Sequence, residues 1–181
     1  GGTGGAGGTG VTGVAGGAAQ FTSGGATTVK ANIILDDGAD GVKGATSTNA
    51  GGAKGVGGTA KLLLNAANTL TGNITAAGNN EGLITTATGA TTIVGSIGAS
   101  DKEINLVSLG HGMLISGDLY AKDIVGTAAN GDLTFTSTTL QTVSAAIDSA
   151  SNNSDVILEA NAIVTFKGKV GTGSDAADDK I

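Results

Sequence analysis

The alternation of apolar and small polar residues along the chain predicts a series of short β-strands. Four five-residue phrases share the pattern apolar-x-Gly-x-apolar, and they occupy positions 70–74, 93–97, 115–119 and 166–170. Their first residues are separated by 23, 22 and 51 positions. Because the last interval is close to twice the others, we expect a further copy without the glycine at Leu140-Gln-Thr-Val-Ser. A period of about 20 to 50 residues indicates a solenoid, a propeller or a repeat array.

A second series of apolar residues precedes the phrases and keeps step with them. Its members are Leu62/Leu64, Leu83, Ile104/Leu106, Leu133/Phe135 and Val156/Leu158. Clusters of Gly, Asn, Asp, Ser and Ala, such as 77–80 and 129–132, stand between the copies and are typical of turns. The two series together indicate a repeating unit with at least two strands.

Two architectures accommodate such a unit. In a hairpin meander, Asn130-Gly131 would form a tight turn between antiparallel strands. In a parallel β-helix, each coil passes once around the axis and stacks on the coil below, so strands of similar sequence lie over one another. The period favours the second, and the predicted fold is an all-β, right-handed parallel β-helix (β-solenoid) with coils of about 20–26 residues. Residues 140–150 also fit a short helix, although a strand is favoured.

The chain divides by composition into three parts. Residues 1–20 form a Gly-rich segment that reads as a flexible linker, and residues 171–181 form a polar acidic tail. The β-solenoid is expected to span residues 21–170, with a long surface loop at 36–60 where no strong strand pattern occurs. Since the chain lacks an initiating Met, we expect an internal or processed piece of a longer chain.

Composition and charge narrow the classes of function. The chain contains 34 Gly, no Pro, no Cys, four aromatic residues and no Arg, so its core must be built from many thin layers of Val, Ile, Leu and Ala. Without Cys, a disulfide framework is excluded. A net charge of −6, with no basic face and few aromatic side chains, disfavours nucleic acid as a partner. The longest apolar runs are too short for a membrane-spanning helix.

The phrases LLLNAANTLTGNI (62–74) and TTIVGSIGASDKEINLVSLG (91–110), together with the abundance of Gly, Thr, Ala and Asn, resemble the passenger region of a bacterial autotransporter. More narrowly, the chain resembles the rickettsial outer membrane protein B and surface cell antigen group over about residues 60–170. The resemblance implies export by a translocating β-barrel of the same precursor and a location at the bacterial cell surface (outer membrane), or secretion. It also implies a coat or adhesive role, with a host-cell surface protein or glycan as partner.

Candidate metal chemistry is confined to two places. Asp36 and Asp40, in the stretch DDGADG, supply oxygen ligands of the kind found in calcium loops. An EF-hand also needs a side-chain oxygen at the third position, which is Gly38 here, and a bidentate Glu at the twelfth, which is Ser47 here. A solvated acidic loop is therefore favoured, and calcium stays open. His111 is the only histidine and reads as a turn residue. No metal ligand and no cofactor is therefore assigned.

Catalytic residues are not assigned either. Glycan-processing enzymes use clustered carboxylates, whereas the acidic residues of this chain fall in different phases of the repeat, namely Asp101, Glu103, Asp118, Asp123, Asp132, Asp148 and Glu159. The predicted function is a non-enzymatic surface coat and adhesin, with loop 36–60 as the candidate recognition segment. The alternatives are a β-helical glycan-processing enzyme and a self-assembling surface-layer or spacer protein without a receptor.

Overall fold

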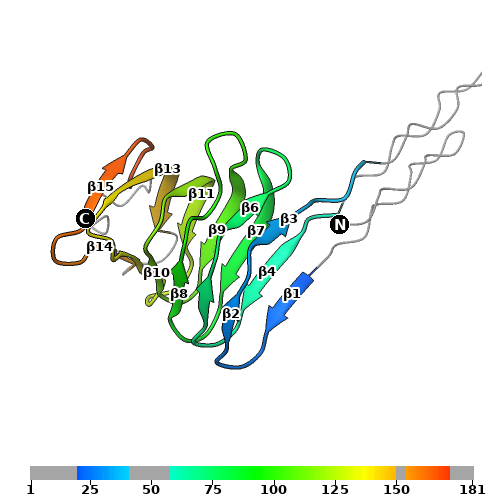
Figure 1. Ribbon diagram of the computed structural model, residues 1–181, viewed down its shortest axis with the longest axis horizontal. Helices are drawn as coiled ribbons and strands as arrows, with labels where there is room; N and C mark the ends of the chain where they lie inside the picture. The colour runs from blue at the N-terminus through cyan, green and yellow to red at the C-terminus, as the bar shows by residue number, and fades with distance from the viewer. Residues whose placement is uncertain (1–19, 41–57, 150–153, 172–181) are drawn as a thin grey trace, which may run out of the picture. The chain divides into compact units, whose positions relative to one another are not determined.

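A computed structural model describes residues 20–40, 58–149 and 154–171, and every regular element within them is a β-strand (Figure 1). The chain forms two compact units, one of Gly1–Phe21 with Asp36–Lys61 and the other of Thr22–Leu35 with Leu62–Ile181. Most of the predicted N-terminal segment, loop and tail lies outside the described residues. No helix in the described part is long and apolar enough to cross a membrane.

The described strands form three sheets. The seven-stranded sheet runs in the order β1 (Gln20–Ser23), β4 (Lys61–Leu64), β7 (Glu81–Thr86), β9 (Ile104–Leu109), β11 (Leu119–Gly126), β13 (Leu140–Ser149) and β15 (Ile163–Phe166). The six-stranded sheet runs in the order β14 (Val156–Leu158), β12 (Leu133–Phe135), β10 (Met113–Ile115), β8 (Thr91–Val94), β5 (Thr69–Thr71) and β2 (Thr28–Lys30). A third sheet joins β3 (Ile33–Leu35) to β6 (Ile74–Ala76).

Neighbouring strands run parallel throughout the described pairs, for example β8 with β10 and β10 with β12. The prediction of an all-β fold is thus confirmed, and its sheets are parallel rather than the antiparallel pairs of a hairpin meander. The strand predicted at 140–150 is also confirmed, as β13. The described residues do not form a closed solenoid.

Apolar residues at equivalent positions of neighbouring strands lie beside one another. What we call the first column belongs to the six-stranded sheet and consists of Val29, Leu70, Ile93, Ile115, Phe135 and Leu158. What we call the second column consists of Ile33, Ile74, Ile97, Leu119, Val143 and Phe166. From residue 70 onward, successive members of either column are 20 to 24 positions apart. The predicted period is therefore the spacing between neighbouring strands of one sheet.

The first three phrases connect the two columns through a glycine corner. Each begins in the first column and ends in the second, so its two apolar residues are buried. Gly72 and Gly95 have φ angles of 140° and 150°, which L-residues rarely adopt. A Cβ atom on Gly95 would lie 2.3 Å from the carbonyl oxygen of Gly72. Successive corners can approach this closely only because the residue has no side chain.

The predicted fourth phrase and the predicted copy at Leu140 are wrong. Phe166 pairs with Val143 and so belongs to the second column, where the first three phrases end. Leu140 pairs with Ile163 in the seven-stranded sheet and is 64% exposed. The segment equivalent to the first three phrases runs from Phe135 to Val143, and it is longer than they are by four residues. That insertion shifted the apparent period.

Gln141 takes the place of the glycine in this longer corner. Its side chain is almost fully buried, and its Nε2 donates to the carbonyl oxygen of Gly117 at 2.6 Å. The side-chain amide of Gln141 thus binds the carbonyl group of the neighbouring corner. At the other corners, a glycine packs closely against the equivalent carbonyl group instead. The second apolar series also mixed two sheets, since Leu83 lies in β7 whereas Leu133 lies in β12.

Candidate functional site

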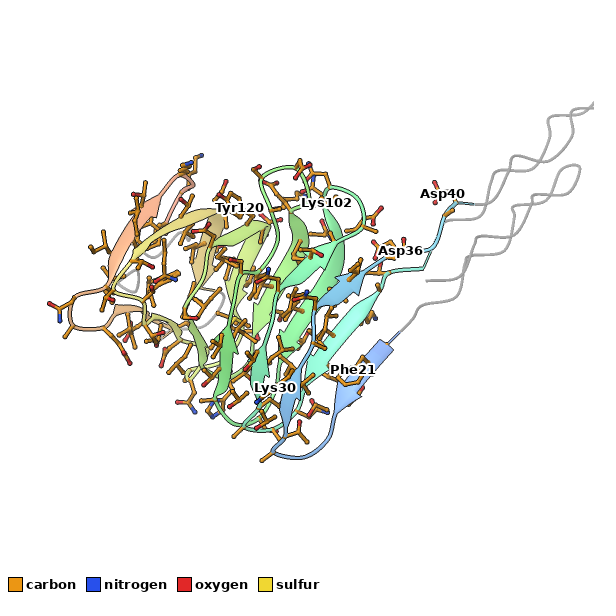
Figure 2. All side chains as sticks on the ribbon, viewed as in Figure 1. Phe21, Lys30, Asp36, Asp40, Lys102 and Tyr120 are labelled. Carbon is orange, nitrogen blue, oxygen red and sulfur yellow. The ribbon has the colours of Figure 1, made fainter. Side chains whose placement is uncertain are left out.

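The acidic segment after β3 does not gather into a cation site within the described residues. Asp37 Oδ1 accepts a hydrogen bond from the Ala60 amide at 2.7 Å, so this carboxylate holds the backbone of its own unit. Asp36 and Asp40 lie at successive points along the segment, and their side chains do not converge in Figure 2. In the described ranges, no three acidic, His or Cys side chains form a group suited to a metal ion. Gly41 and Ser47 lie outside those ranges.

His111 lies in the turn between β9 and β10, as expected. Its Nδ1 accepts a hydrogen bond from the amide of Gly112 at 2.9 Å. Thr86 Oγ1 donates to the His111 carbonyl oxygen at 2.6 Å and accepts from the His111 amide at 3.2 Å. The two contacts of Thr86 attach the turn to β7, whereas the contact of Nδ1 lies within the turn. They are the contacts of a residue that shapes a corner.

The remaining carboxylates of the described residues are dispersed among the strands and turns. Asp132 Oδ1 accepts from the Asp155 amide at 2.9 Å, and Asp123 lies 3.9 Å from Nζ of Lys122 in an exposed pair. Exposed pairs of this kind contribute at most about 1 kcal/mol to stability. Asp101 lies in an exposed turn, and Glu159 follows β14 at the end of the six-stranded sheet. These carboxylates thus lie in different strands and turns, and they do not gather at one place in the described part of the chain.

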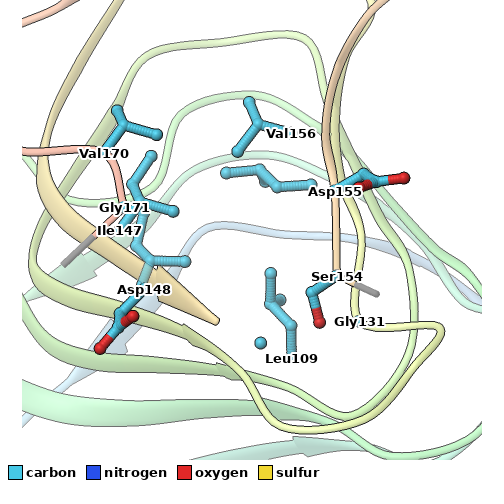
Figure 3. A pocket seen from close by; sticks show the side chains of 12 residues that line it. Leu109, Gly131, Ile147, Asp148, Ser154, Asp155, Val156, Val170 and Gly171 are labelled. Carbon is cyan, nitrogen blue, oxygen red and sulfur yellow. The ribbon is translucent and has the colours of Figure 1, made fainter. Parts of the chain in front are cut away.

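A small cavity lies inside the second unit where β11 and β13 face β12 and β14 (Figure 3). Its volume is about 30 Å³, enough for one or two water molecules. Apolar side chains form most of its wall, among them Leu109 and Ile147. The carboxylates of Asp148 and Asp155 stand at its rim and point away from one another (Figure 3). A space of this size has room for water but is too small for a sugar.

The corners carry a ladder of polar side chains, which we call the corner ladder. In every rung, the side chain after the corner position accepts a hydrogen bond from the backbone amide of its equivalent in the next repeat. The pairs are Asn32 Oδ1 with the Asn73 amide at 2.8 Å, Asn73 Oδ1 with the Ser96 amide at 2.9 Å, Ser96 Oγ with the Asp118 amide at 3.1 Å, and Asp118 Oδ1 with the Thr142 amide at 2.7 Å. These four consecutive contacts fix the register of five repeats at their corners.

The corner ladder was missed in the sequence, although its signal is visible. The fourth position of the first three phrases is Asn, Ser or Asp, residues whose short side chains accept hydrogen bonds from nearby backbone. The pattern apolar-x-Gly-x-apolar treats this position as unspecified. A sharper pattern, with a short polar acceptor after the glycine, describes the same three phrases and excludes the misassigned one at Phe166, which has Lys169 there.

Removing one rung should weaken the fold measurably. We expect Asp118→Ala to lower the free energy of unfolding by about 1 to 2 kcal/mol, because the amide of Thr142 loses its acceptor. Asp118→Asn keeps an acceptor oxygen at the same place and should stay within about 0.5 kcal/mol of the parent. Urea denaturation of the three proteins gives both values. Equal losses from the Ala and Asn variants would contradict the ladder contact.

The outer face of the six-stranded sheet presents a shallow surface of hydroxyl and methyl groups. One outward column, which we call the outer column, consists of Thr28, Thr69, Thr92, Leu114, Thr134 and Ile157. Its side chains are exposed or half-exposed. Two positions further along each strand, Thr71 and Val94 are exposed as well. The face is thus accessible, repetitive and nearly uncharged in its middle.

Comparison with known proteins found no matching protein-family model, no matching curated protein and no matching solved structure.

Proposed function

We propose that this chain is a stretch of right-handed parallel β-helix, with coils of about 20–24 residues. The support is the in-register columns: equivalent residues recur at that spacing in both columns, and a glycine corner joins the first column to the second in each of three successive repeats. From β7 onward the chain also alternates between the seven-stranded and the six-stranded sheet, which is the order of strands expected of a solenoid. The corner ladder adds a polar contact that repeats once per coil.

The function we propose is a non-enzymatic cell-surface passenger that acts as coat and adhesin. The single observation that carries it is the uniform stack of parallel strands beneath a shallow, accessible outer column. Such a stack serves to hold surface segments on a rigid and interchangeable base. The resemblance of residues 60–170 to autotransporter passengers supports export by a translocating β-barrel of the same precursor and a location at the bacterial surface. A host-cell surface protein or glycan is the partner that follows from this proposal.

Loop 36–60 is the proposed recognition segment. Within its own unit the base of the loop is closed by two contacts, because the Gly38 amide donates to the Gly58 carbonyl at 2.7 Å and the Ala60 amide donates to Asp37. Residues 41–57 lie between these contacts and outside the described residues. Replacing only 41–57 therefore leaves the two closing contacts available, which makes the segment separable in an experiment.

Binding to cultured host cells tests the proposal. The labelled chain is titrated onto cells beside a variant in which a short Gly-Ser linker replaces residues 41–57. We expect saturable binding by the parent and at least a tenfold loss of affinity in the variant, because the recognition segment is gone. A control variant with Thr69→Ser and Thr134→Ser keeps the hydroxyl groups of the outer column and should bind like the parent.

Two outcomes of this titration would change the proposal. Saturable binding that survives loop replacement would remove the recognition role from residues 41–57. No binding by any of the three proteins would favour the spacer or surface-layer alternative, which the open strand edges described below also support.

A further inference from the structure

The six-stranded sheet ends in two strands that have a neighbour on one side only. Among the described strands, β14 borders only β12 and β2 borders only β5, and the two lie at opposite ends of the row (Figure 1). Unpaired edges of a parallel sheet present a row of backbone donors and acceptors, which is a template for pairing with another chain. Both edges belong to the second unit.

The backbone of β14 directs hydrogen-bonding groups toward its open side. The Leu133 amide donates to the Asp155 carbonyl oxygen at 2.9 Å, and the Glu159 amide donates to the Phe135 carbonyl oxygen at 3.1 Å. In a parallel strand, alternate residues turn their backbone groups to opposite sides. Leu158, which lies between the bonded positions, therefore presents its N–H and C=O to the open side of β14.

The backbone of β2 presents the complementary set on its open side. The Thr69 amide donates to the Thr27 carbonyl, and the Ala31 amide donates to the Thr71 carbonyl, so these residues of the β2 segment face β5. By the same alternation, Thr28 and Lys30 turn their backbone groups away from β5. Parallel pairing joins one residue of a strand to two residues of its neighbour that are separated by one position. Leu158 of one molecule and Thr28 with Lys30 of another meet this requirement.

Side chains at the two edges agree with the same register. Leu158 is 44% exposed, although the four members of the first column from Leu70 to Phe135 are at most 2% exposed. In the continued register, Val29 of a second molecule lies next to Leu158 and extends the first column. Glu159 follows Leu158, and Lys30 follows Val29; both are exposed. In the same register, Glu159 of one molecule lies opposite Lys30 of the other on the outer face. The contact thus joins an incompletely covered apolar residue to its column and places opposite charges side by side.

We propose that β14 of one molecule pairs in parallel with β2 of a second copy of this chain, with Leu158 next to Val29 and Glu159 next to Lys30. The contact is heterologous, because it uses a different edge on each molecule, and repetition extends it into a linear assembly. A second copy of this chain is the partner we infer, because its β2 edge presents the backbone donors and acceptors that the β14 edge needs. In the same register, its Lys30 lies next to Glu159. This assembly is independent of host-cell binding and of residues 41–57.

Charge exchange at the contact tests the proposal. Sedimentation velocity at low ionic strength is measured over a hundredfold range of concentration for the parent, Lys30→Glu, Glu159→Lys and the double variant. We expect the parent to form a concentration-dependent series of oligomers. Each single variant should weaken association roughly three- to tenfold, because like charges then face each other across the strands. The double variant, and an equimolar mixture of the two single variants, should regain parental association.

Two further variants separate the contact from general effects. Lys102→Glu changes the net charge as Lys30→Glu does, but it lies in an exposed turn between β8 and β9 and should associate like the parent. Leu158→Pro removes the outward N–H of β14 and leaves the hydrogen bonds of Asp155 and Glu159 to β12 in place. It should abolish elongation while circular dichroism stays that of the parent. A parent that stays monomeric throughout, or a mixture of single variants that fails to regain association, would overturn the proposal.

Discussion

The substitution Gly95→Ala is expected to lower the free energy of unfolding by about 3 kcal/mol, a loss that falls in the large tail of point-mutation effects. The φ angle of Gly95 is 150°, and an added Cβ would lie 2.3 Å from the backbone oxygen of Gly72. The corner cannot simply move away, since a Cβ on Gly117 would meet the oxygen of Gly95 at the same 2.3 Å on the other side. A backbone shift that relieved the clash at Gly95 would therefore create a clash at Gly117.

Urea denaturation measures this loss, and Gly25→Ala is the matched control. Gly25 has no heavy atom within 4 Å of its hypothetical Cβ and no positive φ angle. Its substitution should change the free energy of unfolding by less than about 0.5 kcal/mol. If both variants unfold at the urea concentration of the parent, the tight stacking of glycine corners is wrong.

The substitution Phe135→Ala should cost about 3 to 5 kcal/mol, the usual range for truncating a buried aromatic side chain. Phe135 is fully buried in the first column and is the largest side chain in the core of the second unit. Its ring meets that of Phe166 edge-on, with centroids 5.8 Å apart and an interplanar angle of 86°. Since Phe166 belongs to the second column, this contact joins the two sheets.

Thermal and urea unfolding of Phe135→Ala should both report the loss, and Phe135→Leu should recover about half of it because most of the volume is kept. Phe21→Ala is the control, since Phe21 is 52% exposed and its truncation leaves no cavity. A loss for Phe135→Ala no larger than that for Phe21→Ala would contradict a core built around the first column.

The sequence predicted the strands and their period because both follow from local apolar patterning. Leu70, Ile93 and Ile115 are each followed by a glycine at the third position, and the structure places all three in one column. The register of the later repeats was not predicted, because it depends on the length of each corner. The insertion after Phe135 itself contains an apolar residue, Leu140, which lies at the expected interval by coincidence.

The contacts that position the corners were the hardest to foresee. Gln141 reads as an ordinary polar strand residue, and its burial over Gly117 depends on a glycine 24 positions away. The carboxylates of Asp118 and Asp132 read as scattered charges, yet each accepts a backbone hydrogen bond from the next repeat. Side chains of this kind acquire their roles only when the strands are in register. Their sequence spacing therefore identifies them only after the length of every repeat is known.

The measurement that tests the stacked parallel register most directly is a set of distances along the outer column. The protein contains no Cys, so pairs of cysteines can carry spin labels without background. The pairs Thr69/Thr134, Thr28/Thr134 and Thr28/Ile157 are separated by three, four and five steps between neighbouring strands. Pulsed electron paramagnetic resonance should give about 14, 19 and 24 Å, since each step adds about 4.8 Å. Distances that do not increase by one strand spacing per step would contradict the parallel stack and the β-helix proposed from it.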